Sequence, residues 1–112
     1  MKHQDMRRRI AHAAARMLAE DGSLDYGSAK RKAARLLGAT RSAALPGNAA
    51  VEDEVRTYLD LFRADTQPAE LEALRALAEQ WMMRLAEFRP HLCGAVWRGT
   101  ATRLHPLRLQ LY

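Results

Sequence analysis

The chain has 112 residues, enough for one small domain with a single hydrophobic core. Hydrophobic residues make up 48% and charged residues 28%, as in ordinary globular proteins, and no stretch approaches the roughly 20 apolar residues that a membrane span needs. The first residues do not form a signal peptide, and a single cysteine, Cys93, excludes an internal disulfide. The composition therefore predicts a cytoplasmic protein that has no contact with membranes.

The net charge of +5 is unevenly distributed along the chain. Residues 1–47 carry ten Lys and Arg against four Asp and Glu, residues 48–89 carry five against nine, and residues 90–112 carry three against none. The basic segment could face a polyanion, or the basic and acidic segments could pair with each other within the fold.

Four helices are expected in the first 89 residues. Apolar residues at helical spacing, with Asn48 as the N-cap of the third, predict helices over about residues 5–21, 28–37, 48–62 and 68–89. The longest of these has apolar residues in steps of three and four, at Leu71, Leu74, Ala78, Trp81, Leu85 and Phe88. We expect the other helices to pack around it, and a dimerising coiled coil is the alternative.

The composition changes after Pro90. A run of small apolar residues, 92–96, and an alternation of apolar and polar residues over 107–112 predict two strands with a connecting segment. The expected fold is therefore mainly α. It consists of a four-helix bundle over residues 1–89 and a short C-terminal β-hairpin over residues 90–112, packed as a single domain.

After Cys93 the tail reads Gly-Ala-Val-Trp-Arg-Gly-Thr-Ala over residues 94–101, and the alternating residues 107–112 follow. This arrangement resembles the signature of the nucleotidyltransferase superfamily in its minimal, polymerase-β-like form. In that family a strand ends in Gly-Ser, a small turn or helix follows, the loop often reads Gly-Ser-x-x-x-Gly-x-Ala, and the next strand carries a metal-binding Asp-x-Asp. Both glycines and the alanine are in register in the segment Gly94-Ala95-Val96-Trp97-Arg98-Gly99-Thr100-Ala101. The whole chain also resembles, more weakly, longer uncharacterised proteobacterial proteins with a nucleotidyltransferase-like C-terminal half, some of them called UDP-N-acetylmuramate–alanine ligase. The resemblance implies that this chain is a shortened or divergent relative of them.

The metal ligands of that family are missing in this register. Its two aspartates would fall where the chain has Pro106 and Arg108, and its phosphate-contacting serine is replaced by Ala95. Nucleotidyl transfer needs carboxylates to hold metal ions on the triphosphate. The resemblance therefore implies a truncated, catalytically inactive relative that binds no metal or other cofactor.

Such a relative could still act as a nucleotide- or phosphate-binding module, or as a protein-interaction module. The residues that could form the remnant of a phosphate site are Gly94, Ala95, Arg98, Gly99, Arg103 and Arg108. The alternative is that these arginines are ordinary solvated side chains.

A second function is suggested by residues 9–22, which resemble the first helix of tetracycline-repressor-type regulators. A small helix-turn-helix-like module could contact nucleic-acid phosphates through Arg7, Arg8, Lys30, Arg31, Lys32 and Arg35. The recognition helix expected next is replaced by residues 39–47, which contain Pro46 and Gly47.

The predicted hairpin leaves one strand edge open. A two-stranded hairpin is only marginally stable alone, and unpaired N–H and C=O groups on its edge invite a partner strand. We therefore expect a homodimer joined through the helix of residues 68–89 or the strand of residues 107–112.

Overall fold

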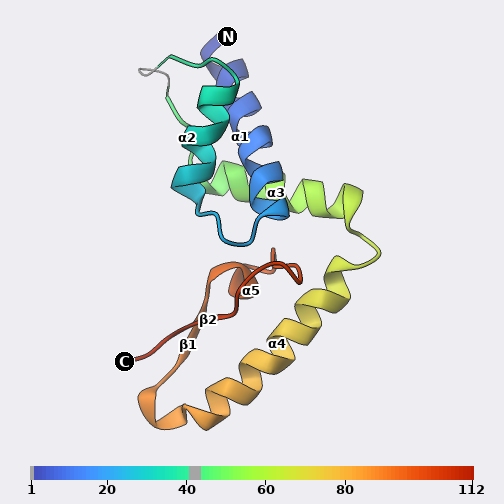
Figure 1. The fold of residues 1–112 in the computed structure, drawn as a ribbon, viewed down its shortest axis with the longest axis vertical. Helices are drawn as coiled ribbons and strands as arrows, with labels where there is room; N and C mark the ends of the chain where they lie inside the picture. The colour runs from blue at the N-terminus through green and yellow to red at the C-terminus, as the bar shows by residue number, and fades with distance from the viewer. Residues whose placement is uncertain (1, 41–43) are drawn as a thin grey trace.

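The computed structural model describes residues 2–40 and 44–112, with side chains from Asp5 onward. Its elements in chain order are α1 (Lys2–Glu20), α2 (Tyr26–Leu36), α3 (Asn48–Phe62), α4 (Gln67–Arg84), the 3₁₀ helix η1 (Ala86–Phe88), β1 (His91–Cys93), α5 (Gly94–Arg98) and β2 (Arg108–Gln110) (Figure 1). The mainly α fold with a short C-terminal hairpin is thereby confirmed. Over the described ranges, no helix combines the length and the apolar character that crossing a membrane requires.

The first three helices form the main hydrophobic core. Helix α1 packs against both α2 and α3, and α3 crosses the lower ends of the pair (Figure 1). The core-facing side chains are mostly small, which allows the helix axes to approach closely. They are Ile10, Ala11, Ala14, Ala15, Leu18 and Ala19 of α1, Ala29 and Ala33 of α2, and Val51, Val55 and Leu59 of α3.

Helix α2 begins earlier than expected, and α3 begins at a different cap from the one expected. The carboxylate of Asp25 accepts a hydrogen bond of 2.7 Å from the backbone N–H of Ser28, so α2 starts at Tyr26 instead of Ser28. Gly47 is the N-cap of α3. Asn48, the expected cap, instead accepts a hydrogen bond of 2.8 Å from Nζ of Lys30, which ties α3 to α2.

Helix α4 is not at the centre of the helices, and the expectation that the others pack around it is wrong. It makes its main contacts with α5, and of its residues, all of which the structure describes, only Ala78 is buried. Leu77, Trp81 and Met83 are exposed. Apolar residues are spread around the circumference of α4, so their helical spacing did not define which face would be covered. The helix also ends at Arg84 instead of Arg89, and η1 follows it.

The tail forms a two-stranded antiparallel sheet with a short helix between its strands. His91 pairs with Gln110 and Cys93 pairs with Arg108. The first strand is shorter than expected, because Gly94, with a φ of 75°, turns the chain into α5. Gly99, with a φ of 82°, ends α5 in the left-handed conformation typical of helix C-termini.

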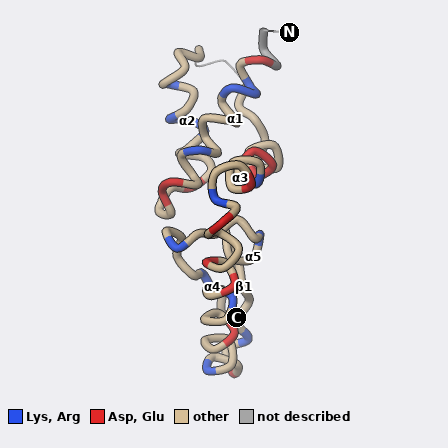
Figure 2. Tube along the Cα trace, turned by 90° about the vertical axis from the view of Figure 1, so that its right-hand side faces the viewer, with Lys and Arg blue, Asp and Glu red and all other residues tan. Residues whose placement is uncertain are grey.

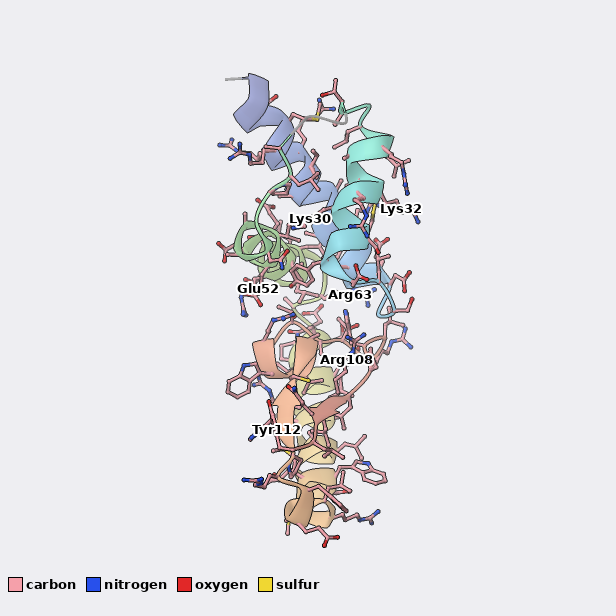
Figure 3. The ribbon with its side chains drawn as sticks, turned by 90° about the vertical axis from the view of Figure 1, so that its left-hand side faces the viewer. Lys30, Lys32, Glu52, Arg63, Arg108 and Tyr112 are labelled. Atoms are coloured by element: carbon pink, nitrogen blue, oxygen red, sulfur yellow. The ribbon has the colours of Figure 1, made fainter. Side chains whose placement is uncertain are left out.

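The molecule is elongated, with extents of 50 × 34 × 19 Å. Figure 1 shows α1–α3 at one end and α4, α5 and the hairpin at the other, joined by the turn of residues 63–66. Figure 3 shows Glu52 of the first part and Arg108 of the second on opposite sides of the junction between them. Helix α4 therefore packs with the tail, although in the sequence it is part of the acidic segment of residues 48–89.

The two parts meet where residues 100–105 lie against the end of α1. Thr100, Ala101 and Thr102 are buried. His105 Nε2 donates a hydrogen bond of 3.0 Å to the carbonyl oxygen of Leu18. Gly22 lies so close to the backbone of the tail that a Cβ added to it would overlap the carbonyl group of Leu104. The contact is thus made largely by backbone, which has little freedom to move aside.

We expect the substitution Gly22→Ala to destabilise the protein by about 1–3 kcal/mol, because the new methyl group must displace backbone atoms of Leu104. Urea unfolding followed by circular dichroism measures the change. The control is Gly27→Ala in α2, where the nearest atom to an added Cβ is the flexible end of Arg31 at 3.2 Å. Alanine favours the helix there, so an equal loss of stability in both variants would contradict the close contact at Gly22.

Candidate functional site

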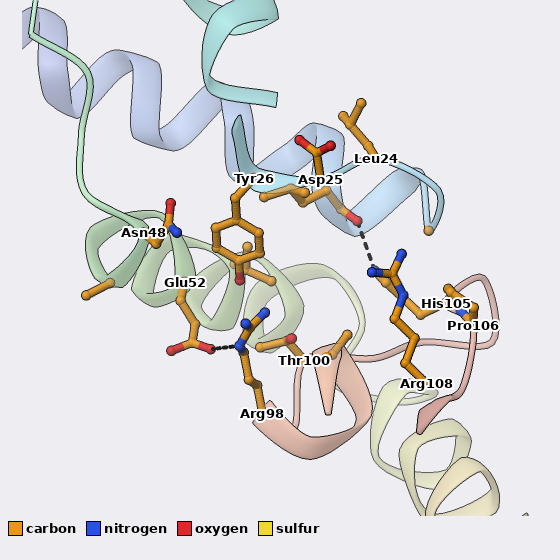
Figure 4. A pocket seen from close by; sticks show the side chains of 16 residues that line it. Leu24, Asp25, Tyr26, Asn48, Glu52, Arg98, Thr100, His105, Pro106 and Arg108 are labelled. Carbon is orange, nitrogen blue, oxygen red and sulfur yellow. Dashed lines mark hydrogen bonds and ion pairs between the residues drawn. The ribbon is translucent and has the colours of Figure 1, made fainter. Parts of the chain in front are cut away.

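A cavity of about 490 Å³ lies at the junction between the first three helices and the tail (Figure 4). Its upper wall comes from the end of α1, the turn before α2 and the first turns of α3. Its lower wall comes from α5, the loop after it and the start of β2. This volume is in the range typical of sites for small molecules.

Several residues of the family-like segment meet in this cavity. Gly94, Ala95, Arg98 and Arg108 line it, as does Pro106. The two positions where the family has metal-binding aspartates therefore face the same space as the glycine that follows β1.

Two of the residues assigned to the phosphate site lie outside the cavity lining. Gly99 does not line the cavity, and a Cβ added to it would point toward the side chains of Arg75 and Arg56. The side chain of Arg103 is exposed, and its backbone N–H donates a hydrogen bond of 3.0 Å to Glu70 of α4. Spacing along the tail did not distinguish these two residues from Arg98 and Arg108.

Arg98 is held from the helical side of the cavity. Its Nε lies 3.7 Å from Oε1 of Glu52 in α3, and its guanidinium carbon lies 5.4 Å from the centre of the Tyr26 ring (Figure 4). Burial raises the pKa of the Tyr26 phenol, and the nearby Glu52 carboxylate raises it further. Tyr26 is therefore a neutral, partly apolar surface beside a cation.

Arg108 extends into the cavity from β2. The stem of its side chain lies over Gly94, where an added Cβ would be 3.4 Å from Cδ of Arg108. The hydrogen bonds from Ser28 lower the pKa of the Asp25 carboxyl, and the positive charge of Arg108 adds a smaller effect in the same direction. The cavity thus receives one cation from α5 and one from β2.

Residues of α3 and α4 fix the position of α5 and the loop that follows it. Arg56 Nη2 donates a hydrogen bond of 2.7 Å to the carbonyl oxygen of Arg98, and Arg75 Nε donates one of 3.1 Å to that of Val96. Gln67 Nε2 donates to the carbonyl oxygens of Gly99 and Ala101, at 3.2 and 2.8 Å. These donors bind carbonyl groups in α5 and in the loop that follows it, and so connect both to α3 and α4.

Sequence reasoning missed the helical side of the cavity, namely Asp25, Tyr26 and Glu52. It also missed the supporting residues, which are Arg56 of α3 and Gln67 and Arg75 of α4. The four-residue spacing of Glu52 and Arg56 indicates a pair on one face of a helix, but no local pattern indicates that this face meets the tail. Among the described residues, no three His, Cys, Asp or Glu side chains are grouped so that they could hold a metal ion.

The basic residues of α1 and α2 are only partly free to contact a polyanion. Figure 2 shows the Lys and Arg positions on these helices and the acidic positions on α3. Lys30 Nζ donates to the carbonyl oxygen of Pro46 and to Asn48, and Arg31 donates to the Ser28 hydroxyl at 3.4 Å. Of the six residues assigned to nucleic-acid contact, all except Lys30 are exposed, namely Arg7, Arg8, Arg31, Lys32 and Arg35.

Comparisons with known proteins identify no relative of this chain. No protein-family model matches it, and neither the curated proteins nor the solved structures contain a significant match.

His105 is a partly buried titratable side chain at the junction. Its Nδ1 lies 3.0 Å from the backbone N–H of Thr102 and its Nε2 faces the Leu18 carbonyl, so a neutral ring protonated on Nε2 makes both hydrogen bonds. Burial lowers the pKa of His105 below its ordinary value of 6.5. The unfolded state therefore binds more protons than the folded state as the pH falls below 6.5.

We expect the free energy of unfolding to decrease as the pH is lowered from 7.5 through 6.5 to 5.5, because the proton binds preferentially to the unfolded chain. Urea unfolding at each pH measures this slope. The variant His105→Gln should flatten it. The control His12→Gln, at a side chain that is 74% exposed, should retain it. A slope that is the same in the wild type and in His105→Gln would contradict this role of His105.

Proposed function

We propose that the cavity binds a small phosphorylated ligand of the nucleotide class and that the protein is a catalytically inactive, nucleotidyltransferase-like binding module. The observation that carries this proposal is the convergence of Arg98 and Arg108 in one cavity, beside Gly94 and Ala95. These are the positions at which the resemblance to the family predicts contact with phosphate.

The chemistry of the lining supports a phosphorylated ligand. Guanidinium groups present several donors in a plane and bind phosphate oxygens through paired, charge-assisted hydrogen bonds. Gly94 has no side chain, which leaves room beside the stem of Arg108. On the helical side, the Tyr26 ring and the apolar side chains of Leu18, Leu24 and Val55 offer a surface for the uncharged part of a nucleotide.

The absence of transfer chemistry is part of the proposal. Pro106 has no side-chain metal ligand, and Arg108 repels a divalent cation from the position that an aspartate holds in the family. Binding without metal-assisted transfer is the function that fits a cavity with two arginines, Arg98 and Arg108, and with no carboxylate at positions 106 and 108. The alternative, nucleic-acid binding through α1 and α2, has less support because Lys30 is engaged within the fold.

We expect the wild-type protein to bind ATP without added metal, as measured by isothermal titration calorimetry. Arg98→Ala and Arg108→Ala should each weaken binding about tenfold, because each removes a charge-assisted contact. Arg103→Ala is the matched control, since it removes the same charge from the tail at a residue outside the cavity.

Two results would contradict the proposal. One is an equal loss of ATP affinity in Arg103→Ala and the two cavity variants, which would indicate attraction by the overall charge and not a site. The other is Mg²⁺-dependent transfer of a nucleotidyl group from a nucleoside triphosphate by the wild-type protein.

We further propose that the protein forms a homodimer through the side of α4 next to α5. A shallow groove there is lined by apolar side chains that include Met82, Leu92 and Trp97. Met83, at its rim, is 75% exposed and Trp97 is 66% exposed. The adjacent two-stranded sheet has an unpaired edge on each strand, so a second copy could cover both the groove and an edge.

We expect light scattering after gel filtration to give a dimer mass that falls toward the monomer mass on dilution. Met83→Lys should shift this equilibrium toward monomer, because it places a charge on the apolar rim. Leu36→Lys is the control, because Leu36 is equally exposed, at 71%, but lies on α2, away from the groove. A monomer mass for the wild type at every concentration would refute the dimer.

A further inference from the structure

Glu52 lies between two arginines at the edge of the cavity. Its Oε1 is 3.7 Å from Nε of Arg98 and 3.8 Å from Nη2 of Arg56. Both distances allow an ion pair but are too long for a hydrogen bond. Oε1 is nevertheless buried, and within the described part of the chain it has no hydrogen-bond partner. The carboxylate is therefore neutralised by its neighbours without being held in place by them.

We propose that Glu52 is a built-in competitor for the anionic ligand. In the empty cavity its carboxylate neutralises Arg98, and the phosphate group of the ligand replaces it there. This inference rests on the proposed function, because it concerns the same cavity and the same class of ligand. A phosphate group with two or more negative charges displaces a single carboxylate more readily than a singly charged ligand does, so Glu52 favours phosphorylated ligands over carboxylic acids.

Arg56 makes the exchange feasible, because it neutralises Glu52 when Arg98 turns to the ligand. It is four residues after Glu52 on α3, so the two side chains lie on the same face of the helix. Its Nη2 is fixed by the hydrogen bond of 2.7 Å to the carbonyl oxygen of Arg98. That bond goes to the backbone, so it does not depend on where the Arg98 side chain points. Arg56 is thus a positioning residue for Glu52 and for the end of α5.

The balance of charge in the cavity explains why one carboxylate matters. Arg98 and Arg108 from the tail face Asp25 and Glu52 from the helical side, which leaves no net formal charge among these four groups. The Arg98 side chain is 48% exposed and that of Glu52 is 26% exposed, so their ion pair adds little to stability. Removal of the Glu52 charge should therefore affect ligand binding more than folding.

The test is calorimetric titration of ATP, without added metal, into the wild type and a set of α3 variants. Glu52→Gln should tighten ATP binding about twofold to fivefold, the range expected for loss of one partly exposed competing ion pair. Glu52→Ala should do the same, and it serves as a second variant if the glutamine is poorly accommodated. Asp53→Asn is the matched control, because it removes the same charge from the exposed neighbouring position of α3 and should leave the affinity unchanged.

A double-mutant cycle tests the role of Arg56. Arg56→Gln should weaken ATP binding when Glu52 is present, because the displaced carboxylate then lacks its counterion. In the Glu52→Gln background the same substitution should have a clearly smaller effect, since no carboxylate needs to be neutralised. A merely structural role of Arg56 would weaken binding equally in both backgrounds, and that result would overturn the inference.

Failure of this inference is distinguishable from failure of the proposed function. Wild-type binding of ATP, with unchanged or weaker affinity in both Glu52→Gln and Glu52→Ala, would overturn the competitor role and leave the binding site intact. Absence of ATP binding in the wild type and in every variant would overturn both.

Discussion

The arrangement of this protein depends on the contact between residues 100–105 and the end of α1. His105 donates to the carbonyl oxygen of Leu18, and Gly22 leaves space for the backbone of Leu104. Because α4 makes its main contacts with α5, the tail reaches the first three helices chiefly through this contact and through Arg56 and Arg98. The cavity exists because the contact holds its two walls opposite each other.

The charges at the junction follow from the uneven distribution of charge along the chain. The tail has arginines and no acidic residue, whereas the segment that forms α3 and α4 is rich in carboxylates. Pairing of Arg98 with Glu52 therefore brings oppositely charged segments together within the fold. For the same reason, the charges of Arg98 and Arg108 in the cavity lining are balanced by Asp25 and Glu52 from the helical side.

The sequence predicted the fold class and the approximate positions of the helices, but not which helices pack together. Helical spacing located α1, α3 and α4, and glycines at positions 94 and 99 mark the turns around α5. Propensity and spacing are local, so they identified a helix over residues 67–84 and could not show that only Ala78 of it is buried. The same limit applies to Arg98, Arg103 and Arg108, which look equivalent in the sequence although only two of them face the cavity.

By itself, the sequence determined which groups the tail can offer. It has glycines where the chain must turn, three arginines, and no carboxylate at positions 106 and 108. Only the tertiary structure decided what these groups face. Tyr26 and Glu52 meet Arg98 because the 100–105 segment docks on α1, and that contact depends on shape complementarity between residues far apart in the chain. The spacing of residues within each segment does not indicate such a contact, because neither the sequence of α1 nor that of residues 100–105 depends locally on the other segment.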